Sequence, residues 1–326
     1  MTIAIIGAGL AGLSAAAVLR ASGANVRLFD KGRGAGGRMS TRRADTPMGE
    51  MRWDHGAQYF TARDGAFAET IENWVRAGVA AQWRGDFRVI EAVGQPAKPL
   101  KDVPRYVGAP SMNAILKHMA NGHDVLWERR VSRLERDGMY SQLIFEDGSV
   151  DGGFEAVIVA VPAEQAVGLL GGSAPEIATA AANITSAPCW AVMLAFDVPT
   201  TIAFDGAKVA SGPLAWVARN SAKPGRESGE TWVLHASPDW SRANIERDKG
   251  DVTDALVSAF MKLTDAPAPV FAAAHRWRYA QVEAPVGRVL WAQEAGIGAC
   301  GDWCLGGKVE AAWLSGKALA EEILAN

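Results

Sequence analysis

The order of apolar and polar residues in the first thirty positions predicts a strand, a turn, a helix and a second strand. An apolar run at residues 3–6 predicts the first strand, and apolar residues with helical spacing at Ala16 and Leu19 predict a helix with one buried face. A second apolar run at 26–29 ends on Asp30. The N-terminal stretch is therefore predicted to be a βαβ unit with a carboxylate at the end of its second strand.

Later apolar patterns predict further helices and strands, without an internal repeat or a low-complexity tract. Helical spacing predicts helices at residues 64–83, with Val75 on the buried face, from Ser111 as N-cap through Met119, and at 163–170, 174–183, 252–263 and from 309 onward. Apolar runs predict strands at residues 125–131, 140–145, 156–161, 190–196, 214–219, 231–237 and 272–279. Prolines and glycines between 86 and 105 indicate a strand pair or a loop. The strands after residue 190 are expected to form an antiparallel sheet.

The turn between the first strand and the helix carries the glycine pattern of a dinucleotide-binding site. Gly7 permits a tight turn, Gly9 lets the backbone approach a pyrophosphate, and Gly12 lets the helix pack closely against the strand. Leu10 and Ala11 open the helix, where free N–H groups and a partial positive charge can face phosphates. We therefore expect a dinucleotide cofactor at this turn.

The segment after the second strand extends this pattern. Asp30 lies eighteen residues after Gly12, where a carboxylate can accept hydrogen bonds from ribose hydroxyls, and Lys31 follows it. The run Gly36-Gly37-Arg38-Met39 comes next. Glycines allow close approach to a ligand, and the Arg38 guanidinium can donate a fork of hydrogen bonds to a phosphate. The alternative is a flexible glycine-rich loop beside a nicotinamide site.

An acid followed by this glycine pair and arginine resembles the flavoproteins of the amine oxidase and FAD-dependent oxidoreductase superfamily. Two stretches, FDKGRGAGGRMSTRR at 29–43 and HGAQYFTAR at 55–63, are similar to the renalase branch of that superfamily, particularly its bacterial members. The run VIVAVP at 157–162 and the Gly301-Asp302 pair near the C-terminus match it as well. The resemblance implies FAD as the cofactor, held without a covalent bond.

The resemblance also implies which residues contact FAD outside the N-terminal motif. They are Gly56, Ala57, Gln58 and Tyr59 beside the isoalloxazine ring, Val131 beside the adenine, and Gly301, Asp302, Val309 and Glu310 beside the ribityl chain and the flavin N1/O2 edge. The last two begin a helix. A helix N-terminus suits the N1/O2 edge because reduced flavin accumulates negative charge there.

The implied fold is α/β with two interleaved domains. A Rossmann-like (GR2-type) βαβ domain that binds FAD is expected from residues 1–62, 104–162 and 285–326. An α+β substrate domain with an antiparallel sheet is expected from residues 63–103 and 163–284, because Pro162 ends the apolar run and marks the exit of the chain.

The activity implied by the resemblance is oxidation of dihydronicotinamides, since renalases oxidise the 2- and 6-dihydro isomers of NAD(P)H to NAD(P)+. The hydride passes to flavin N5, and O2 is reduced to H2O2. Stretches at 214–220, 232–236 and 275–279 match the renalase pattern. The residues expected to position the substrate are His235, Asn220 and Tyr59, and those expected to bind it are Arg219, Trp277 and Tyr279. A histidine inside an apolar strand is more often a satisfied core residue, which is the alternative for His235.

Two other functions stay open at the level of sequence. A true amine oxidase would need an aromatic sandwich over the flavin and often a lysine-bound water at N5, and no lysine is clearly placed for that role. A flavin-bearing binding protein without turnover is the second alternative.

Composition narrows the class and its partners. The 326 residues are 49% hydrophobic and 21% charged, which is typical of a soluble globular protein with a sizeable core. The formal net charge of −3 gives no reason to expect nucleic acid or an anionic membrane as partner, and no apolar run reaches the roughly 18 residues of a membrane span. Cys189, Cys300 and Cys304 are too few and too scattered for a disulfide framework or a metal site. We expect a cytoplasmic protein that acts on a small molecule and O2, with its oligomeric state and preferred isomer open.

Overall fold

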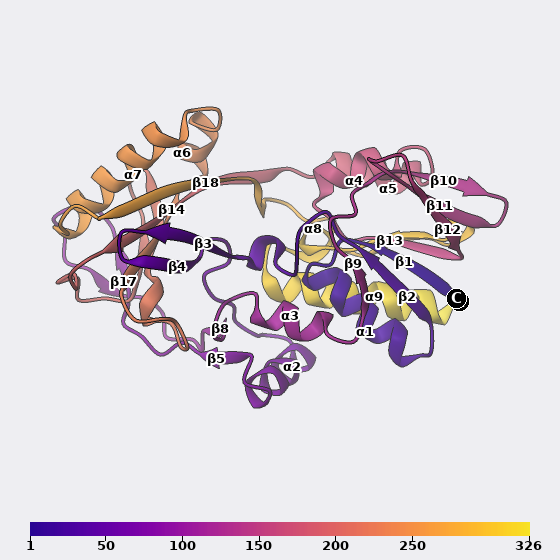
Figure 1. Ribbon diagram of the computed structural model, residues 1–326, viewed down its shortest axis with the longest axis horizontal. Coiled ribbons are helices and arrows are strands. Elements are labelled where there is room, and N and C mark those ends of the chain that lie inside the picture. Colours follow the sequence, from indigo (N-terminus) through magenta and orange to yellow (C-terminus); the bar gives the residue numbers. More distant parts are fainter.

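Two large sheets organise the chain, one in each lobe of an elongated molecule (Figure 1). The structure is a computed structural model that describes residues 1–326. The first lobe is built on a six-stranded sheet and the second on a seven-stranded sheet. The chain crosses between the two sheets several times, so neither lobe is a contiguous piece of sequence.

The six-stranded sheet forms around the N-terminal βαβ unit. Its strands run in the order β19 (Leu290–Ala292), β20 (Ile297–Ala299), β13 (Ala156–Val159), β1 (Thr2–Ile6), β2 (Asn25–Phe29) and β9 (Asp124–Leu126). All neighbours are parallel except β19 and β20. Every residue of β13 is buried, as its unbroken apolar run predicts.

Helices α1 (Leu10–Ala21), α3 (Ala114–Ala120) and α9 (Val309–Ala325) pack together beside this sheet. A Cβ at Gly316 of α9 would lie 2.0 Å from the carbonyl oxygen of Ala11, so only glycine lets α1 and α9 cross this closely. The other face of the sheet is covered by the three-stranded sheet β10 (Val131–Asp137), β11 (Tyr140–Phe145) and β12 (Val150–Phe154) with the helices α4 (Ala163–Leu170) and α5 (Pro175–Ala182).

The seven-stranded sheet forms the second lobe. Its strands run in the order β18 (Phe271–Val282), β14 (Ser186–Phe196), β17 (Glu230–Ala236), β16 (Leu214–Arg219), β15 (Gly206–Val209), β6 (Phe87–Ile90) and β7 (Lys98–Pro99). Neighbours are antiparallel except β15 and β6. Helices α6 (Pro238–Ala243) and α7 (Lys249–Thr264) cover one face (Figure 1), and Val252, Leu256 and Phe260 of α7 are fully buried there.

The opposite face of this sheet receives the hairpin β3 (Thr41–Thr46) and β4 (Gly49–Asp54), whose buried Trp53 packs against Met193 and Val233. The remaining elements are α2 (Gly65–Arg76), β5 (Ala80–Gln82), β8 (Tyr106–Gly108), α8 (Asp302–Leu305) and the short 3-10 helices Gly37–Met39, Asn220–Ala222 and Gln293–Ala295. The hairpin follows residues 30–40, named the cofactor loop after the FAD contacts predicted for it. It carries the chain from the first lobe onto the sheet of the second.

The helix predicted at 64–83 is too long. It ends at Arg76, because Gly78 adopts a φ of +72° and turns the chain into β5. Val75, expected on the buried face, is 41% exposed, whereas Phe67, Ile71 and Trp74 are buried as predicted.

Two other local predictions are wrong. The strand predicted at 125–131 is divided, because Glu128 adopts a φ of +56° between β9 and β10. Asn113, and not Ser111, precedes the first turn of α3, and the Ser111 hydroxyl donates to the Asn113 side-chain oxygen at 2.8 Å. The predicted α/β class, with a Rossmann-like unit and a mainly antiparallel sheet in a second lobe, is confirmed. None of the helices combines the length and apolar character that crossing a membrane requires.

Candidate active site

The glycine turn after β1 has the geometry of a phosphate-binding turn. Gly7 adopts a φ of +105°, and a Cβ there would lie 2.6 Å from the carbonyl oxygen of Ala160. A Cβ at Gly12 would lie 2.0 Å from the carbonyl oxygen of Gly7, whereas a Cβ at Gly9 would meet no atom within 4 Å. Gly9 thus faces open space at the start of α1, and no side chain caps this helix. Its first N–H groups are free to bind an anion.

Asp30 ties this turn to the loop that follows β2. Its carboxylate accepts hydrogen bonds from the N–H groups of Ala8, at 2.8 Å, and Gly32, at 2.6 Å. The carboxylate keeps further lone pairs for ribose hydroxyls. Lys31 takes another direction and donates to the Gln165 side chain at 2.7 Å.

Arg38 and Asp302 bring together two motifs that lie 264 residues apart. The guanidinium donates two hydrogen bonds to the carboxylate, at 2.7 and 2.5 Å. The Asp302 side chain is 8% exposed and that of Arg38 is 30% exposed. Because a guanidinium has five N–H donors, Arg38 keeps donors on its exposed side that suit a phosphate.

Other residues predicted to contact the cofactor lie near Arg38 and Asp302 in the sequence. Gly36 and Gly37 turn the chain into the short helix that ends at Met39, which is buried. Val309 begins α9, and no side chain caps its N-terminus. Uncapped N-termini on α1 and α9 therefore give the site two clusters of free backbone donors.

Two predicted cofactor residues have different surroundings. Glu310 is 9% exposed, and its carboxylate accepts from the N–H groups of Arg63, at 2.6 Å, and Asp64, at 2.8 Å. The side chain therefore anchors the segment before α2 to α9, and the flavin contact predicted for Glu310 rests on the backbone at the start of α9. Val131 opens β10, pairs with Phe145 and is 8% exposed, so only its backbone is suited to an adenine contact.

Residues 55–59, named the flavin segment after the contact predicted for them, run from the β3–β4 hairpin along the cofactor loop. A Cβ at Gly56 would lie 2.1 Å from the carbonyl oxygen of Arg38, and the Ala57 N–H donates to the same oxygen at 2.8 Å. Only glycine at position 56 therefore lets these two backbone segments come into contact. The contact fixes the segment beside the loop that carries Gly36 and Gly37.

The buried Gln58 side chain links this segment to the second lobe. Its Nε2 donates to the carbonyl oxygen of Gly56 at 3.0 Å and lies 3.4 Å from Nε2 of His235. Its Oε1 accepts a hydrogen bond from the Lys223 ammonium at 3.1 Å. Gln58 thus has a fixed orientation before any ligand binds.

Tyr59 lies against aromatic and cationic groups. Its ring centroid is 5.4 Å from that of Trp216, and the Arg105 guanidinium carbon is 5.4 Å from the centroid of the Tyr59 ring. The Trp216 indole N–H is buried without a hydrogen-bond partner in the chain. Buried donors without a partner are uncommon in folded proteins, so this N–H is open to a ligand or a water molecule.

Three histidines and a tryptophan form a wall on the sheet face that meets the flavin segment. The His55 carbonyl oxygen accepts from the Trp277 indole at 3.0 Å, and it lies 3.1 Å from Nε2 of His235. The His55 ring centroid lies 4.6 Å from that of His275 and 4.9 Å from that of Trp277. His235 and His275 both register with Ala191 of β14, which places them on one face of the sheet.

These imidazoles are neutral at neutral pH. Burial, followed by the charges of His275 and Arg42, lowers the pKa of His55 to about 3. Burial lowers the pKa of His235 to about 4, and burial together with Arg42 lowers that of His275 to about 4. Because His235 Nε2 faces a carbonyl oxygen, which only accepts, the proton of the neutral ring is assigned to Nε2.

The structure does not bring every predicted substrate residue to this wall. Arg219 lies on the other face of the sheet, with its guanidinium 5.1 Å from the Trp232 ring and 3.8 Å from Glu230. Trp277 is on the wall, and the half-buried Tyr279 lies two residues further along β18, where the register with β14 shifts. Arg219 therefore does not belong to the wall, and its contact with substrate stays a prediction.

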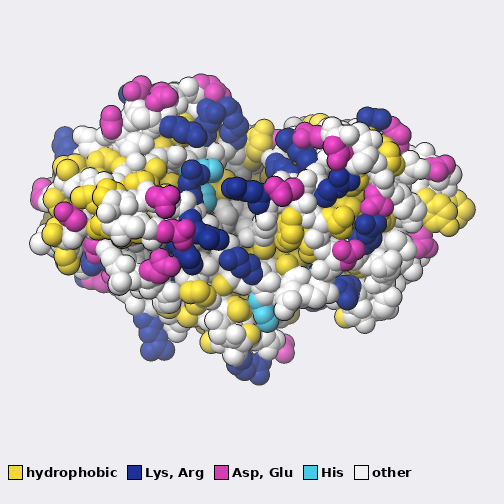
Figure 2. Space-filling view, in the orientation of Figure 1, with side chains coloured by type: hydrophobic (Ala, Val, Ile, Leu, Met, Phe, Trp, Pro, Cys, Tyr) yellow, Lys and Arg dark blue, Asp and Glu magenta, His cyan; other side chains and the backbone are white.

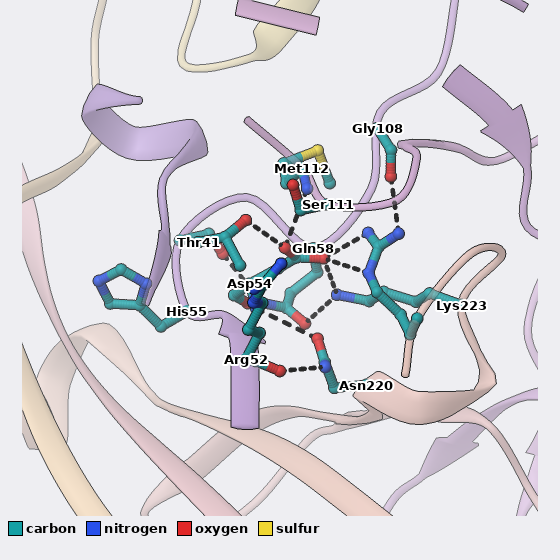
Figure 3. A network of polar contacts seen from close by, with 12 residues as sticks. Thr41, Arg52, Asp54, His55, Gln58, Gly108, Ser111, Met112, Asn220 and Lys223 are labelled. Atoms are coloured by element: carbon teal, nitrogen blue, oxygen red, sulfur yellow. Dashed lines mark hydrogen bonds and ion pairs between the residues drawn. The ribbon is translucent and has the colours of Figure 1, made fainter. Parts of the chain in front are cut away.

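Asn220 is fully used inside the chain. It is 1% exposed, its amide oxygen accepts from the Asp54 N–H at 3.1 Å, and its amide nitrogen donates to the Arg52 carbonyl at 3.0 Å (Figure 3). With both ends of its amide paired within the chain, Asn220 positions β4 and the residues that follow it, and its role toward substrate stays a prediction.

A buried charged network beside the site, formed by Asp54, Lys223 and Arg226, was not predicted from the sequence (Figure 3). The Arg226 guanidinium and Lys223 ammonium lie 2.5 and 3.4 Å from Oδ2 of Asp54, and Oδ1 accepts from Thr41 at 2.7 Å and from the Met112 N–H at 3.0 Å. The only signal in the sequence is the presence of two cations around a Pro-Gly turn at 223–226. That signal does not say which acid they meet.

The two cysteines near Gly301 are unsuited to a covalent flavin link. Cys300 and Cys304 are both buried. Burial raises the pKa of the Cys300 thiol to about 12 and that of Cys304 well above its ordinary value. Both remain protonated and shielded, so neither offers a thiolate.

The fold and the site together define a dinucleotide-dependent oxidoreductase. They combine a Rossmann-like unit, two uncapped helix N-termini and a second lobe whose sheet carries aromatic and histidine side chains on one face. Residues 5–73 match the model of the NAD(P)-binding Rossmann-like domain, and residues 73–324 match that of the flavin containing amine oxidoreductases. The chain belongs to the flavin containing amine oxidoreductase family. It is an FAD-dependent oxidoreductase, and the FAD is bound without a covalent link.

Several solved structures share the fold over the full chain at 14% sequence identity. A candidate protoporphyrinogen oxidase from Exiguobacterium sp. 255-15 matches with a TM-score of 0.78, covering 100% of this chain and 99% of that one. Putrescine oxidase bound to putrescine matches with a TM-score of 0.71 and covers 100% of both chains. An oxidoreductase from Methanosarcina mazei matches with a TM-score of 0.72, covering 98% of this chain and 100% of that one. At this identity the likeness concerns the fold.

Asp30→Ala is expected to weaken FAD binding at least about tenfold, because it removes a charged acceptor for the ribose, one contact to the glycine turn and one to the loop after β2. The dissociation constant of FAD and the flavin content after dialysis measure the effect. Asp45→Ala, which removes an exposed carboxylate from the β3–β4 hairpin, is the control. Full flavin content and unaltered affinity in Asp30→Ala would show that the ribose assignment is wrong.

Proposed function

We propose that this chain is an oxidase of dihydronicotinamide nucleotides, which oxidises 2- and 6-dihydro-NAD(P) to NAD(P)+ and reduces O2 to H2O2. In this proposal, residues 1–62, 104–162 and 285–326 hold FAD, and residues 63–103 and 163–284 supply most of the substrate site. When held there, FAD would supply the hydride acceptor, N5, and the route for the electrons to O2.

The observation that supports this proposal best is the absence of a free acid on the wall formed by His55, His235, His275 and Trp277. Three of these groups are neutral imidazoles, and the nearby carboxylate of Asp54 is neutralised by two buried cations. A small amine is a cation at neutral pH and needs a carboxylate or a cluster of acceptors. A dihydronicotinamide ring is uncharged, and its carboxamide is matched by amide and imidazole groups.

The chain's own residues would orient the ring and exclude water. His235 is fixed by its hydrogen bond to the His55 carbonyl, and the buried Gln58 side chain, which is held by Gly56 and Lys223, supports this arrangement from behind. Trp277, Trp216 and Tyr59 supply flat apolar faces against which a nicotinamide ring can pack. Holding the ring in one orientation is the protein's main contribution to hydride transfer.

Amine oxidation is the second candidate, and the position of Lys223 is the observation that favours it. This lysine is fully buried beside the flavin segment, although no lysine was predicted to lie there from the sequence. Its ammonium, however, donates to Asp54 and Gln58 and so has two of its three N–H groups in use.

An aerobic assay with 6-dihydro-NAD tests the proposed function. We expect one molecule of H2O2 and one of NAD+ for each molecule consumed, with the product identified by its absorbance and by alcohol dehydrogenase. The same protein is expected to form no peroxide from putrescine or other small amines. Peroxide from amines alone would replace the proposal by the second candidate.

A further inference from the structure

A cationic pair lies at the outer edge of the histidine wall. Arg42 of β3 reaches across to β18, where its Nη1 lies 3.4 Å from Nδ1 of His275. Arg42 is exposed, and His275 is half-buried. Figure 2 shows Lys and Arg side chains gathered where the two lobes meet, with histidine beside them.

The pair has unused hydrogen-bond donors. A guanidinium has no acceptor, so Nδ1 of His275 accepts from Arg42 and the ring proton is assigned to Nε2. No other hydrogen bond joins either side chain to the chain. The Nε2–H of His275 and the remaining N–H groups of Arg42 are therefore free to bind an acceptor.

The charges around His275 all favour an anion. Besides burial, the groups that lower the pKa of His275 are Arg42 and Lys249, and no carboxylate acts against them. Beneath the pair, His55 is 4% exposed and its Nδ1 has no hydrogen-bond partner. A cluster with several free donors and no acid is complementary to phosphate oxygens.

We propose that Arg42 and His275 form a phosphate-binding subsite that selects substrates carrying a phosphate beyond the nicotinamide ribose. The inference rests on the proposed function, because it assigns the phosphate to the substrate of the same site. Arg42 supplies the permanent charge and its remaining donors, and His275 supplies an N–H from the wall side. The opposing interpretation is that the pair only clasps the β3–β4 hairpin to β18.

Steady-state kinetics with two forms of one substrate separate these interpretations. The KM for 6-dihydronicotinamide riboside, divided by the KM for its mononucleotide, measures the preference for phosphate. Arg42→Ala is expected to lower this ratio by about 10- to 100-fold, the usual effect of a lost charge-assisted contact. Arg43→Ala, the next exposed arginine of the same hairpin, is expected to keep the wild-type ratio. An unaltered ratio in Arg42→Ala would overturn the subsite and leave only the clasp.

A binding measurement tests the subsite without turnover. Titration calorimetry of the FAD-loaded protein is expected to detect ADP-ribose but not adenosine, and Arg42→Ala is expected to weaken ADP-ribose binding by the same factor. If 6-dihydro-NAD is not oxidised while ADP-ribose still binds through Arg42, the proposed function fails and the anion subsite stands. If oxidation occurs and ADP-ribose binding ignores Arg42, the subsite alone is wrong.

Discussion

Asp54→Asn is expected to lower the free energy of unfolding of the flavin-loaded protein by about 3–5 kcal/mol. The Asp54 side chain is completely buried, and those of Lys223 and Arg226 are 0% and 4% exposed. Removing the acid leaves two buried cations without a counter-charge, which is more costly than losing an exposed ion pair. Urea unfolding followed by far-UV circular dichroism measures the difference, with Asp45→Asn on the exposed side of the hairpin as control.

The same network predicts how stability varies with pH. Lys223 and Arg226, with the hydrogen bonds from Met112 and Thr41, outweigh burial and lower the pKa of Asp54 to about 2. A carboxyl group whose pKa is lower in the folded state than in the unfolded state stabilises the fold above the unfolded pKa of about 3.9. This contribution is lost as the pH falls from about 4 to about 2. Unfolding energies equal to wild type in Asp54→Asn at pH 7 would contradict this role of the network.

Gly12→Ala is expected to yield protein without flavin. A Cβ at this position would lie 2.0 Å from the carbonyl oxygen of Gly7, so α1 must move away from β1 and its N-terminus leaves the phosphate position. The flavin-to-protein absorbance ratio of the purified variant measures the effect.

Gly23→Ala is the matched control for general destabilisation. Gly23 follows the same helix with a φ of +89°, and a Cβ there would meet no atom within 4 Å. This variant is expected to cost about 1 kcal/mol of stability while keeping its flavin. If Gly12→Ala retained flavin to the same extent as Gly23→Ala, the close packing of α1 on β1 would not be what holds the cofactor.

The βαβ unit could be predicted because its signals are local. Apolar runs mark β1 and β2, and Gly7 and Gly12 stand where a Cβ would collide with neighbouring backbone. Element ends were predicted less well, since single residues with positive φ decide them. Gly78 ends α2 early, and Glu128 separates β9 from β10, although glutamate gives no sign of that conformation.

The wall formed by His55, His235, His275 and Trp277 could be predicted only in part. The sheet face on which a side chain lies depends on the register of its strand. Plain alternation along β16 puts Trp216 and Arg219 on opposite faces, because the register with β17 is unbroken from Trp216 to Arg219. The pairing of Trp216 with His235 and of Arg219 with Trp232 decides which face meets residues 55–59 and which meets the helices. The sequence of one strand does not show these pairings.

The buried charges beneath the wall were beyond prediction for a different reason. Lys223 and Asp54 are 169 residues apart, and each alone resembles an ordinary surface residue. Only the fold brings them into contact. The same holds for Arg42 and His275, which lie in separate motifs of the sequence.

Anaerobic mixing in a stopped-flow spectrometer tests the central claim, oxidation of a dihydronicotinamide by FAD, most directly. The flavin-loaded protein is mixed with 6-dihydro-NAD in one experiment and with putrescine in another, and the absorbance band of oxidised flavin is followed. We expect 6-dihydro-NAD to bleach this band in a rapid, substrate-dependent phase that yields NAD+, and putrescine to leave it unaltered. Bleaching by putrescine with no response to 6-dihydro-NAD would contradict the account.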